Sequence, residues 1–237
     1  MLGNAPGGLQ LLPSEAYGCG WLRIVSKNGK QLKSLPEHGD PYKEIYERTD
    51  VWWGLLREAW INPANSAKAG LDRTIEHLAK AKEFHQKINT TYHPISYAHY
   101  GCDAKRPAFQ NVTWEVPDKL PADQLDALHI LRDSTQGGVD LTTQADLPEM
   151  TKPSSSLNRE ELNNLSGAFY ASMRSPADPG DETVPMHSAD AQLRSGKFKG
   201  IFRQTGYEHQ DSYQDKDAVA STLYSIIRIA QEMKWKC

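Results

Sequence analysis

Hydrophobic side chains recur at helical spacing in the first half of the chain. Residues 41–62 are rich in aromatic side chains and would form a helix with a broad apolar face. From about residue 67 to residue 89 the pattern is clearer, because apolar residues recur at steps of three or four with one double step. Before these two predicted helices, residues 1–40 are loop-rich, and the short apolar stretch 21–25 predicts a strand.

The middle of the chain alternates between a compact apolar run and polar segments. Residues 94–100 form the apolar run, which Gly101 closes, and predict a strand. The segment from residue 103 to residue 165 is polar and broken by proline and glycine, but residues 111–116 and 139–142 alternate at period two. We therefore expect these two stretches to form a surface hairpin inserted between core elements, with an exposed linker after it.

The last third has the most regular organisation. The predicted elements are, in order, a buried strand at 168–173, a loop at 175–185, a helix at 188–194, a strand at 198–203, a loop at 206–211 and an amphipathic helix at 217–234. One side of the last helix carries Val219, Leu223, Ile226, Ile227, Ala230 and Met233. Strand–loop–helix repeated in this way indicates an α/β fold with a parallel sheet. Ligands of such sheets bind at the carboxyl ends of the strands, where we expect both Asp181 and His209 to emerge.

Composition narrows the class of protein. Of the 237 residues 38% are apolar and 24% charged, and the formal net charge is −3 with no cluster of lysine and arginine, which argues against nucleic-acid binding. No apolar run approaches the ~20 residues that span a bilayer, and the N-terminus lacks a secretory signal, so the expected compartment is the cytoplasm. Cys19, Cys102 and Cys237 are unclustered, which predicts neither a disulfide framework nor a cysteine metal site.

The segment Pro179–Pro185, followed by Ser188, carries the most specific motif. It resembles the GDxTVP segment of α/β-hydrolase lipases related to lecithin–cholesterol acyltransferase and of the GPI inositol-deacylase-like esterases. The opening NAPGGLQLLP resembles bacterial members of this group, including lipases found among type VI secretion effectors. The resemblance implies a partial α/β-hydrolase fold, a lipid ester as substrate, and neither a cofactor nor a metal.

The same resemblance assigns roles to two residues. Asp181 would be the acid of a catalytic triad, and His209, which follows 28 residues later, would be its histidine. A histidine can take the proton of a serine hydroxyl near neutral pH, and the carboxylate fixes the imidazole tautomer. Taken alone, however, an aspartate in a loop of glycine and proline is more often a turn former, and an isolated histidine is more often a surface residue.

The chain departs from these lipases in one essential feature. Its 237 residues contain no Gly-x-Ser-x-Gly and no Gly-x-Cys-x-Gly, so the nucleophile motif is absent. Three hypotheses follow: a truncated or split-gene product that is inactive alone, an enzyme half that regains activity with a separate N-terminal lipase half, or a non-catalytic binding protein derived from a lipase. If the chain is part of an effector, secretion by a type VI-like system is an alternative to the cytoplasm.

The remaining candidates have weaker support. His187 is placed for a capping or surface role, and His93 and His99 would share a strand face without the further ligands that a metal needs. His77 and His85 flank an apolar helical stripe and are expected to be solvated. The tryptophans at 52, 53 and 60 either pack a helix onto the core or contact lipid from a lid. The expected organisation is a loop-rich segment with cap or lid helices at 1–92, and the C-terminal part of a hydrolase core at 93–237.

Overall fold

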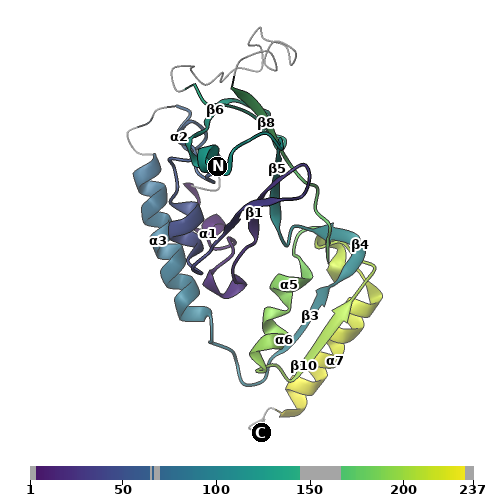
Figure 1. Cartoon of the computed structure of the whole chain (residues 1–237). Coiled ribbons are helices and arrows are strands. Elements are labelled where there is room, and N and C mark those ends of the chain that lie inside the picture. Colours follow the sequence, from purple (N-terminus) through teal and green to yellow (C-terminus); the bar gives the residue numbers. More distant parts are fainter. Residues whose placement is uncertain (1–3, 65, 67–69, 145–166, 233–237) are drawn as a thin grey trace. The chain divides into compact units, whose positions relative to one another are not determined.

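A computed structural model describes residues 4–64, 66, 70–144 and 167–232, and the chain divides into two compact units (Figure 1). The first unit comprises residues 1–85 and 112–174, and the second comprises residues 86–111 and 175–237. The chain therefore passes from the first unit into the second, returns to the first, and then passes into the second again.

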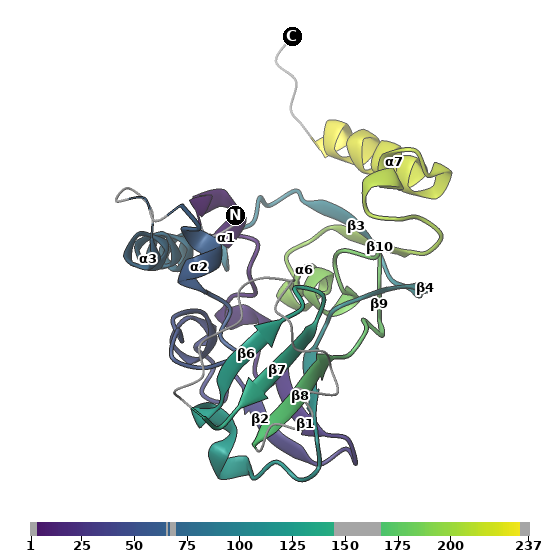
Figure 2. The ribbon, with the colours of Figure 1, turned by 90° about the horizontal axis from the view of Figure 1, so that it is seen from above.

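The first unit is built on a six-stranded sheet with the order β2-β1-β5-β8-β7-β6. The strands are β1 (Leu22–Ser26), β2 (Gln31–Leu35), β5 (Val112–Val116), β6 (His129–Asp133), β7 (Gly138–Thr142) and β8 (Ala168–Met173). Only β1 and β5 run parallel, and the other neighbouring pairs are antiparallel. Figure 2 shows β6, β7 and β8 side by side in this sheet. The sheet is thus mostly antiparallel within a mixed α/β protein.

The expected surface hairpin does not exist. The two alternating stretches form β5 and β7, and β8 lies between them in the sheet. All five residues of β7 are buried. Alternation at period two identified both strands, but it carries no information on which strands pair. The apolar run 168–173 was likewise correct as a strand but wrong in its place, because β8 belongs to this sheet and not to a parallel sheet beside the acid loop.

Helices of the first unit are mostly short. They are α1 (Pro6–Leu9), η2 (Glu15–Tyr17), the π-helical turn η3 (Tyr42–Tyr46), α2 (Glu58–Ile61), α3 (Leu71–Ile88) and η4 (Ala122–Ala127). The single helix expected at 41–62 is therefore wrong, since only its two ends are helical. Tyr46 is fully buried and its hydroxyl donates to the carbonyl oxygen of Pro13 at 2.6 Å, which fixes the first turn to the preceding loop.

The two histidines of α3 were expected to be solvated, but both make contacts inside the first unit. His77 is buried, and His85 bridges two segments, with its Nδ1 2.5 Å from the hydroxyl of Tyr42 and its Nε2 2.8 Å from the carbonyl oxygen of Gln10. A neutral imidazole satisfies both contacts, accepting at Nδ1 and donating at Nε2. His85 thus has a structural role in joining α3 to the N-terminal loop.

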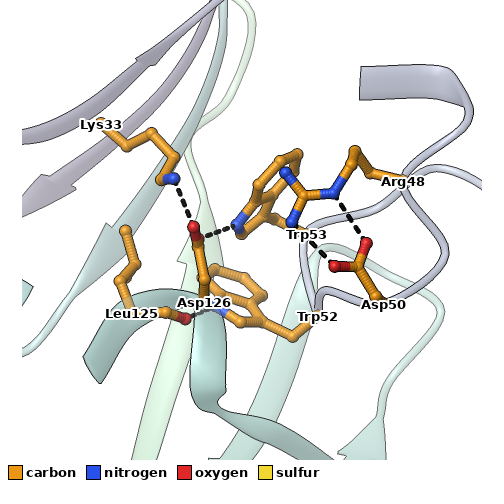
Figure 3. A network of polar contacts seen from close by, with 7 residues as sticks. All are labelled: Lys33, Arg48, Asp50, Trp52, Trp53, Leu125 and Asp126. Atoms are coloured by element: carbon orange, nitrogen blue, oxygen red, sulfur yellow. Dashed lines mark hydrogen bonds and ion pairs between the residues drawn. The ribbon is translucent and has the colours of Figure 1, made fainter. Parts of the chain in front are cut away.

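Trp52 and Trp53 pack into the first unit (Figure 3), whereas Trp60, the third tryptophan of the predicted cluster, is 47% exposed. The indole N–H of Trp52 donates to the carbonyl oxygen of Leu125, and that of Trp53 to a carboxylate oxygen of Asp126, both at 2.9 Å. The other oxygen of Asp126 pairs with Lys33 at 2.6 Å. The cations of Lys33 and Arg48 lie 5.3 and 5.4 Å from the centroid of the Trp53 ring.

Two pairs of strands form the frame of the second unit. They are the parallel pair β3 (Tyr97–Gly101) and β10 (Gly200–Gln204), and the antiparallel pair β4 (Asp103–Ala108) and β9 (Asp178–Gly180). The helices are α5 (Met186–Ala189), α6 (Ala191–Ser195), η5 (Gln210–Tyr213) and α7 (Lys216–Glu232). The partner of β10 is therefore β3, the apolar run predicted at 94–100. The parallel pairing was expected, but with the wrong strand.

Helix α7 packs on β3 and β10 (Figure 1). The ring of Tyr224 lies edge-on to Tyr97 of β3 and Phe202 of β10, with centroid distances of 6.4 and 5.7 Å. Ala218 and Ser221 are buried, and the hydroxyl of Thr222 lies 3.3 Å from Nε2 of His99 on β3. The large apolar residues predicted to face the core point outward instead, since Val219, Leu223, Ile226 and Ile227 are all exposed. Periodicity located the stripe correctly, but small residues allow the closer approach to the sheet. Met233 lies outside the described residues.

None of the described helices has both the length and the apolar character needed to cross a bilayer.

We predict that Leu141→Ala destabilises the first unit. Leu141 lies in β7 and has no exposed surface, so the truncation leaves a cavity and lowers the free energy of unfolding by about 2–5 kcal/mol. Leu11→Ala is the matched control, because Leu11 is 84% exposed and its truncation changes this free energy by less than about 0.5 kcal/mol. Urea denaturation followed by tryptophan fluorescence measures both, and equal effects would contradict the assignment of the core.

Candidate active site

Asp181 and His209 lie in contact within the second unit. Nδ1 of His209 is 2.9 Å from Oδ2 of Asp181, and the backbone N–H of His209 donates to the carbonyl oxygen of Asp181 at 3.0 Å. Two bonds thus join the residues, one through side chains and one through the backbone. The pair that the sequence motif singled out is brought together with the geometry that a carboxylate–imidazole pair requires.

A tight turn holds the carboxylate of Asp181 in position. Its Oδ1 accepts hydrogen bonds from the backbone N–H groups of Thr183 and Val184, at 3.2 and 2.7 Å. Glu182 inside this turn has a positive φ of 70°, a conformation that is uncommon for a residue with a side chain. Its carboxylate pairs with Arg106 of β4 at 2.5 Å. One carboxylate oxygen of Asp181 is therefore engaged by the backbone, and the other faces His209.

Two glycines allow the strands to approach this turn closely. A Cβ on Gly101, at the carboxyl end of β3, would lie 2.7 Å from the Cβ of Asp181. A Cβ on Gly180 would lie 2.5 Å from the carbonyl oxygen of Val184. Real Cβ atoms do not approach so closely, so a side chain at either position must displace the turn. The sequence showed Gly101 only as the end of an apolar run, and gave no sign of this contact.

The two members of the pair differ in exposure. The side chain of Asp181 is 9% exposed and that of His209 is 46% exposed. Nδ1 faces the carboxylate, so in the neutral imidazole it carries the proton and Nε2 has a free lone pair. Within the described part of its own unit, Nε2 has no hydrogen-bond partner. A buried acid that orients a half-exposed base leaves one nitrogen available to accept a proton from an incoming group.

Tyr207 adds a neutral polar group beside the acid. Burial, and then the nearby charge of Asp181, raise the pKa of the Tyr207 phenol to about 12, so it stays protonated near neutral pH. The hydroxyl is buried and has no hydrogen-bond partner among the described residues. Sequence reasoning missed this residue, although it lies two positions before His209.

A polar cluster joins strands β3 and β10 to the junction of α5 and α6. Tyr100 of β3 donates its hydroxyl proton to Asp190, which joins α5 to α6, and the guanidinium of Arg203 on β10 bonds to Asp190 at 2.6 and 3.1 Å. Burial and the charge of Asp190 raise the pKa of Tyr100. Since these residues tie β3, β10 and the intervening helices together, they hold the loops that bear Asp181 and His209. The sequence motifs did not include them.

The other candidate residues lie on other elements. His187 lies in α5, and His93 precedes β3, where it bonds to the backbone of Ile95. His99 lies within β3 and contacts Thr222, so His93 and His99 do not share a strand. Among the residues that the structure describes, no group of three or more His, Cys, Asp or Glu side chains is placed to hold a metal ion.

The comparisons with known proteins give one structural similarity. No protein-family model and no curated protein matches the sequence. The chain is similar to one chain of a solved structure described as "The crystal structure of Tle4-Tli4 complex", with 28% sequence identity and a TM-score of 0.68. The match covers 99% of this chain and 47% of the solved one, so this chain spans about half of its length. The match fits the resemblance to type VI secretion lipase effectors that the sequence motifs carry.

Proposed function

We propose that this chain supplies the acid and the general base of a serine hydrolase that cleaves lipid esters. The 2.9 Å contact between Nδ1 of His209 and Oδ2 of Asp181 is the observation that carries the proposal. The GDxTVP resemblance and the similarity to a chain of the Tle4–Tli4 complex support the lipase class and the partial α/β-hydrolase fold. The assignment of residues 93–237 to the C-terminal part of the hydrolase core, and of 1–92 to a cap, is part of the same proposal.

The chemistry follows from the orientation of the imidazole. Nε2 of His209 takes the proton of a serine hydroxyl as the oxygen attacks the ester carbonyl, and Asp181 stabilises the imidazolium that forms. His209 then gives this proton to the departing alcohol, which leaves an acyl-enzyme. Water adds to the acyl group in the second half, its proton passing to Nε2 and back to the serine oxygen as the fatty acid leaves.

The serine lies outside these 237 residues. No Gly-x-Ser-x-Gly occurs in the 237 residues, and the matched solved chain is about twice as long as the region of similarity. The chain by itself is therefore proposed to be inactive, and a separate N-terminal lipase half would complete the site. Transfer by a type VI-like system would then apply to the assembled protein.

Binding without catalysis is the second candidate. The similar chain was crystallised in a complex of two named proteins, which favours a protein partner for the present chain as well. The two candidates differ in one respect, since a pure binding protein has no need for a histidine whose Nε2 is free and whose Nδ1 is held by a buried carboxylate.

We predict that the chain alone is inactive as an esterase. The chain alone hydrolyses a short-chain aryl ester no faster than its His209→Ala variant, because the nucleophile is missing. With a polypeptide that carries the serine motif, the wild-type chain gives activity that His209→Ala lowers by about a thousandfold or more and Asp181→Asn by about 10⁴-fold. His93→Ala is the matched control, since His93 is exposed and bonds only within its own loop.

Activity of the chain alone that His209→Ala abolishes would show that another nucleophile is present, and would overturn the proposed division. Association without activity would favour the binding candidate.

We predict that the close approach of β3 to Asp181 is required for activity. Gly101→Ala places a Cβ against Asp181 and displaces the carboxylate from His209, so the activity of the assembled hydrolase falls by about 10- to 100-fold. Gly7→Ala makes the same chemical change where no atom lies within 4 Å, and leaves the activity unchanged. Steady-state hydrolysis of the aryl ester compares the two variants, and an unaltered rate in Gly101→Ala would remove this glycine from the site.

A further inference from the structure

The loop that carries His209 leaves β10 at the point where β3 and β10 stop pairing. Their parallel register ends with Gln204 opposite Gly101, and the N–H of Cys102 still donates to the carbonyl oxygen of Gln204 at 2.8 Å. In a continued parallel ladder the next bond would run back from the chain of β10 to the carbonyl oxygen of Cys102. The donor of that next bond is the N–H of Gly206.

The N–H of Gly206 donates to a side chain. Its acceptor is Oδ2 of Asp103, at 3.0 Å. The backbone of Asp103 already belongs to β4, where it lies opposite Gly180 of β9. The chain thus turns from β3 into β4 at this point, and the carboxylate of Asp103 takes the place of a strand carbonyl as the acceptor for the departing loop.

Asp103 is thereby connected to both loops of the candidate pair. Its backbone lies opposite Gly180, which directly precedes Asp181. Its carboxylate holds Gly206, which lies three residues before His209. The position of the imidazole relative to the carboxylate of Asp181 therefore depends on Asp103 from both sides.

The short loop from Gly206 to His209 is held at both of its ends. The N–H of Gly206 bonds to Asp103 at one end, and the N–H of His209 donates to the carbonyl oxygen of Asp181 at the other. Tyr207 between them is buried. The φ of Gly206 is 102°, in the left-handed region that favours glycine. Because glycine has more backbone conformations open to it than other residues, the bond to Asp103 is needed to select this one.

The carboxylate of Asp103 is ionised near neutral pH and has little freedom to turn. Its Oδ1 accepts the backbone N–H of Lys105 at 2.8 Å, so its two oxygens face two different backbone donors. The bond from Lys105 lowers the pKa of Asp103, and the bond from Gly206 and the charges of Lys105 and Arg106 act in the same direction. An ionised acceptor makes a stronger hydrogen bond than a backbone carbonyl does.

We propose that Asp103 is a positioning residue of the hydrolase, whose carboxylate fixes the loop that bears His209 and so keeps the imidazole against Asp181. This inference rests on the proposed function. Asp103 acts through Gly206 and takes no part in the transfer of protons. It lies outside both sequence motifs, and only the bond across the end of the β3–β10 pair identifies it.

Two substitutions at Asp103 and one in the first unit test this role. Asp103→Ala removes both carboxylate oxygens, whereas Asp103→Asn keeps one oxygen that can accept the N–H of Gly206. Asp118→Ala is the matched control, because Oδ1 of Asp118 accepts the backbone N–H of Asn28 at 2.8 Å and its loss likewise frees one loop amide.

Amide hydrogen exchange on the chain alone measures the loop without any activity. Asp103→Ala is expected to speed exchange at Gly206 and His209 about tenfold or more, and Asp103→Asn and Asp118→Ala to change it by less than about threefold. The amides inside α7, which packs on β3 and β10, should exchange at the wild-type rate in all variants. Equal acceleration in α7 would show that Asp103 only stabilises the unit, and would overturn the proposal.

The wild-type chain gives a reading that does not depend on the folding of any variant. The bond to Asp103 should slow exchange at Gly206 about tenfold or more relative to an unstructured peptide of the same local sequence. An amide of Gly206 that exchanges as fast as in the peptide would overturn the proposal.

Hydrolysis by the assembled protein separates this role from the proposed function. With a polypeptide that carries the serine motif, Asp103→Ala is expected to lower kcat about 10- to 100-fold and to leave KM unchanged, because the imidazole moves and the substrate site does not. An active assembly whose kcat is unaltered by Asp103→Ala, or lowered equally by Asp103→Asn, would overturn the role of Asp103 alone. A loosened loop in Asp103→Ala, beside a wild-type assembly without activity, would refute the proposed function and leave the positioning of His209 by Asp103 standing.

Discussion

The contact between Asp181 and His209 depends on how closely the carboxyl end of β3 approaches the acid loop. Gly101 has no side chain, and this absence lets the turn that bears Asp181 lie against the strand. The parallel register of β3 and β10 then sets where the loop after β10 emerges, and His209 lies in that loop. The backbone bond from His209 to Asp181 and the cluster of Tyr100, Asp190 and Arg203 stabilise the same arrangement. Local backbone geometry thus positions the pair before any substrate is present.

The two units divide the tasks of the chain. The first unit has its own hydrophobic core, built on the six-stranded sheet and on buried aromatic residues such as Tyr42, Tyr46 and Trp52. The indole N–H groups of Trp52 and Trp53 find their acceptors within the unit and serve packing. The second unit holds the candidate chemistry, on the loops around the small parallel pair of β3 and β10.

The sequence predicted the local elements better than their partners. The GDxTVP motif and the spacing of 28 residues to His209 were sufficient to select Asp181 and His209. The structure places Oδ2 of Asp181 2.9 Å from Nδ1 of His209. The strands at 112–116, 138–142 and 168–173 were recognised from alternation and apolar runs, but their common sheet was not, because strand pairing depends on contacts between distant residues. In α7 the stripe was located but assigned to the wrong side. The contribution of Gly101 could not be read from the sequence, since it arises from the approach of two backbones.

We propose that His209 activates a serine that lies outside these 237 residues. The most direct measurement is labelling with a fluorophosphonate, which reacts covalently with an activated serine, followed by mass spectrometry of the labelled peptide in the assembled protein. We expect the label on a serine outside the 237 residues, and we expect His209→Ala to abolish labelling. Labelling of a serine within the 237 residues, or labelling that does not require His209, would contradict it.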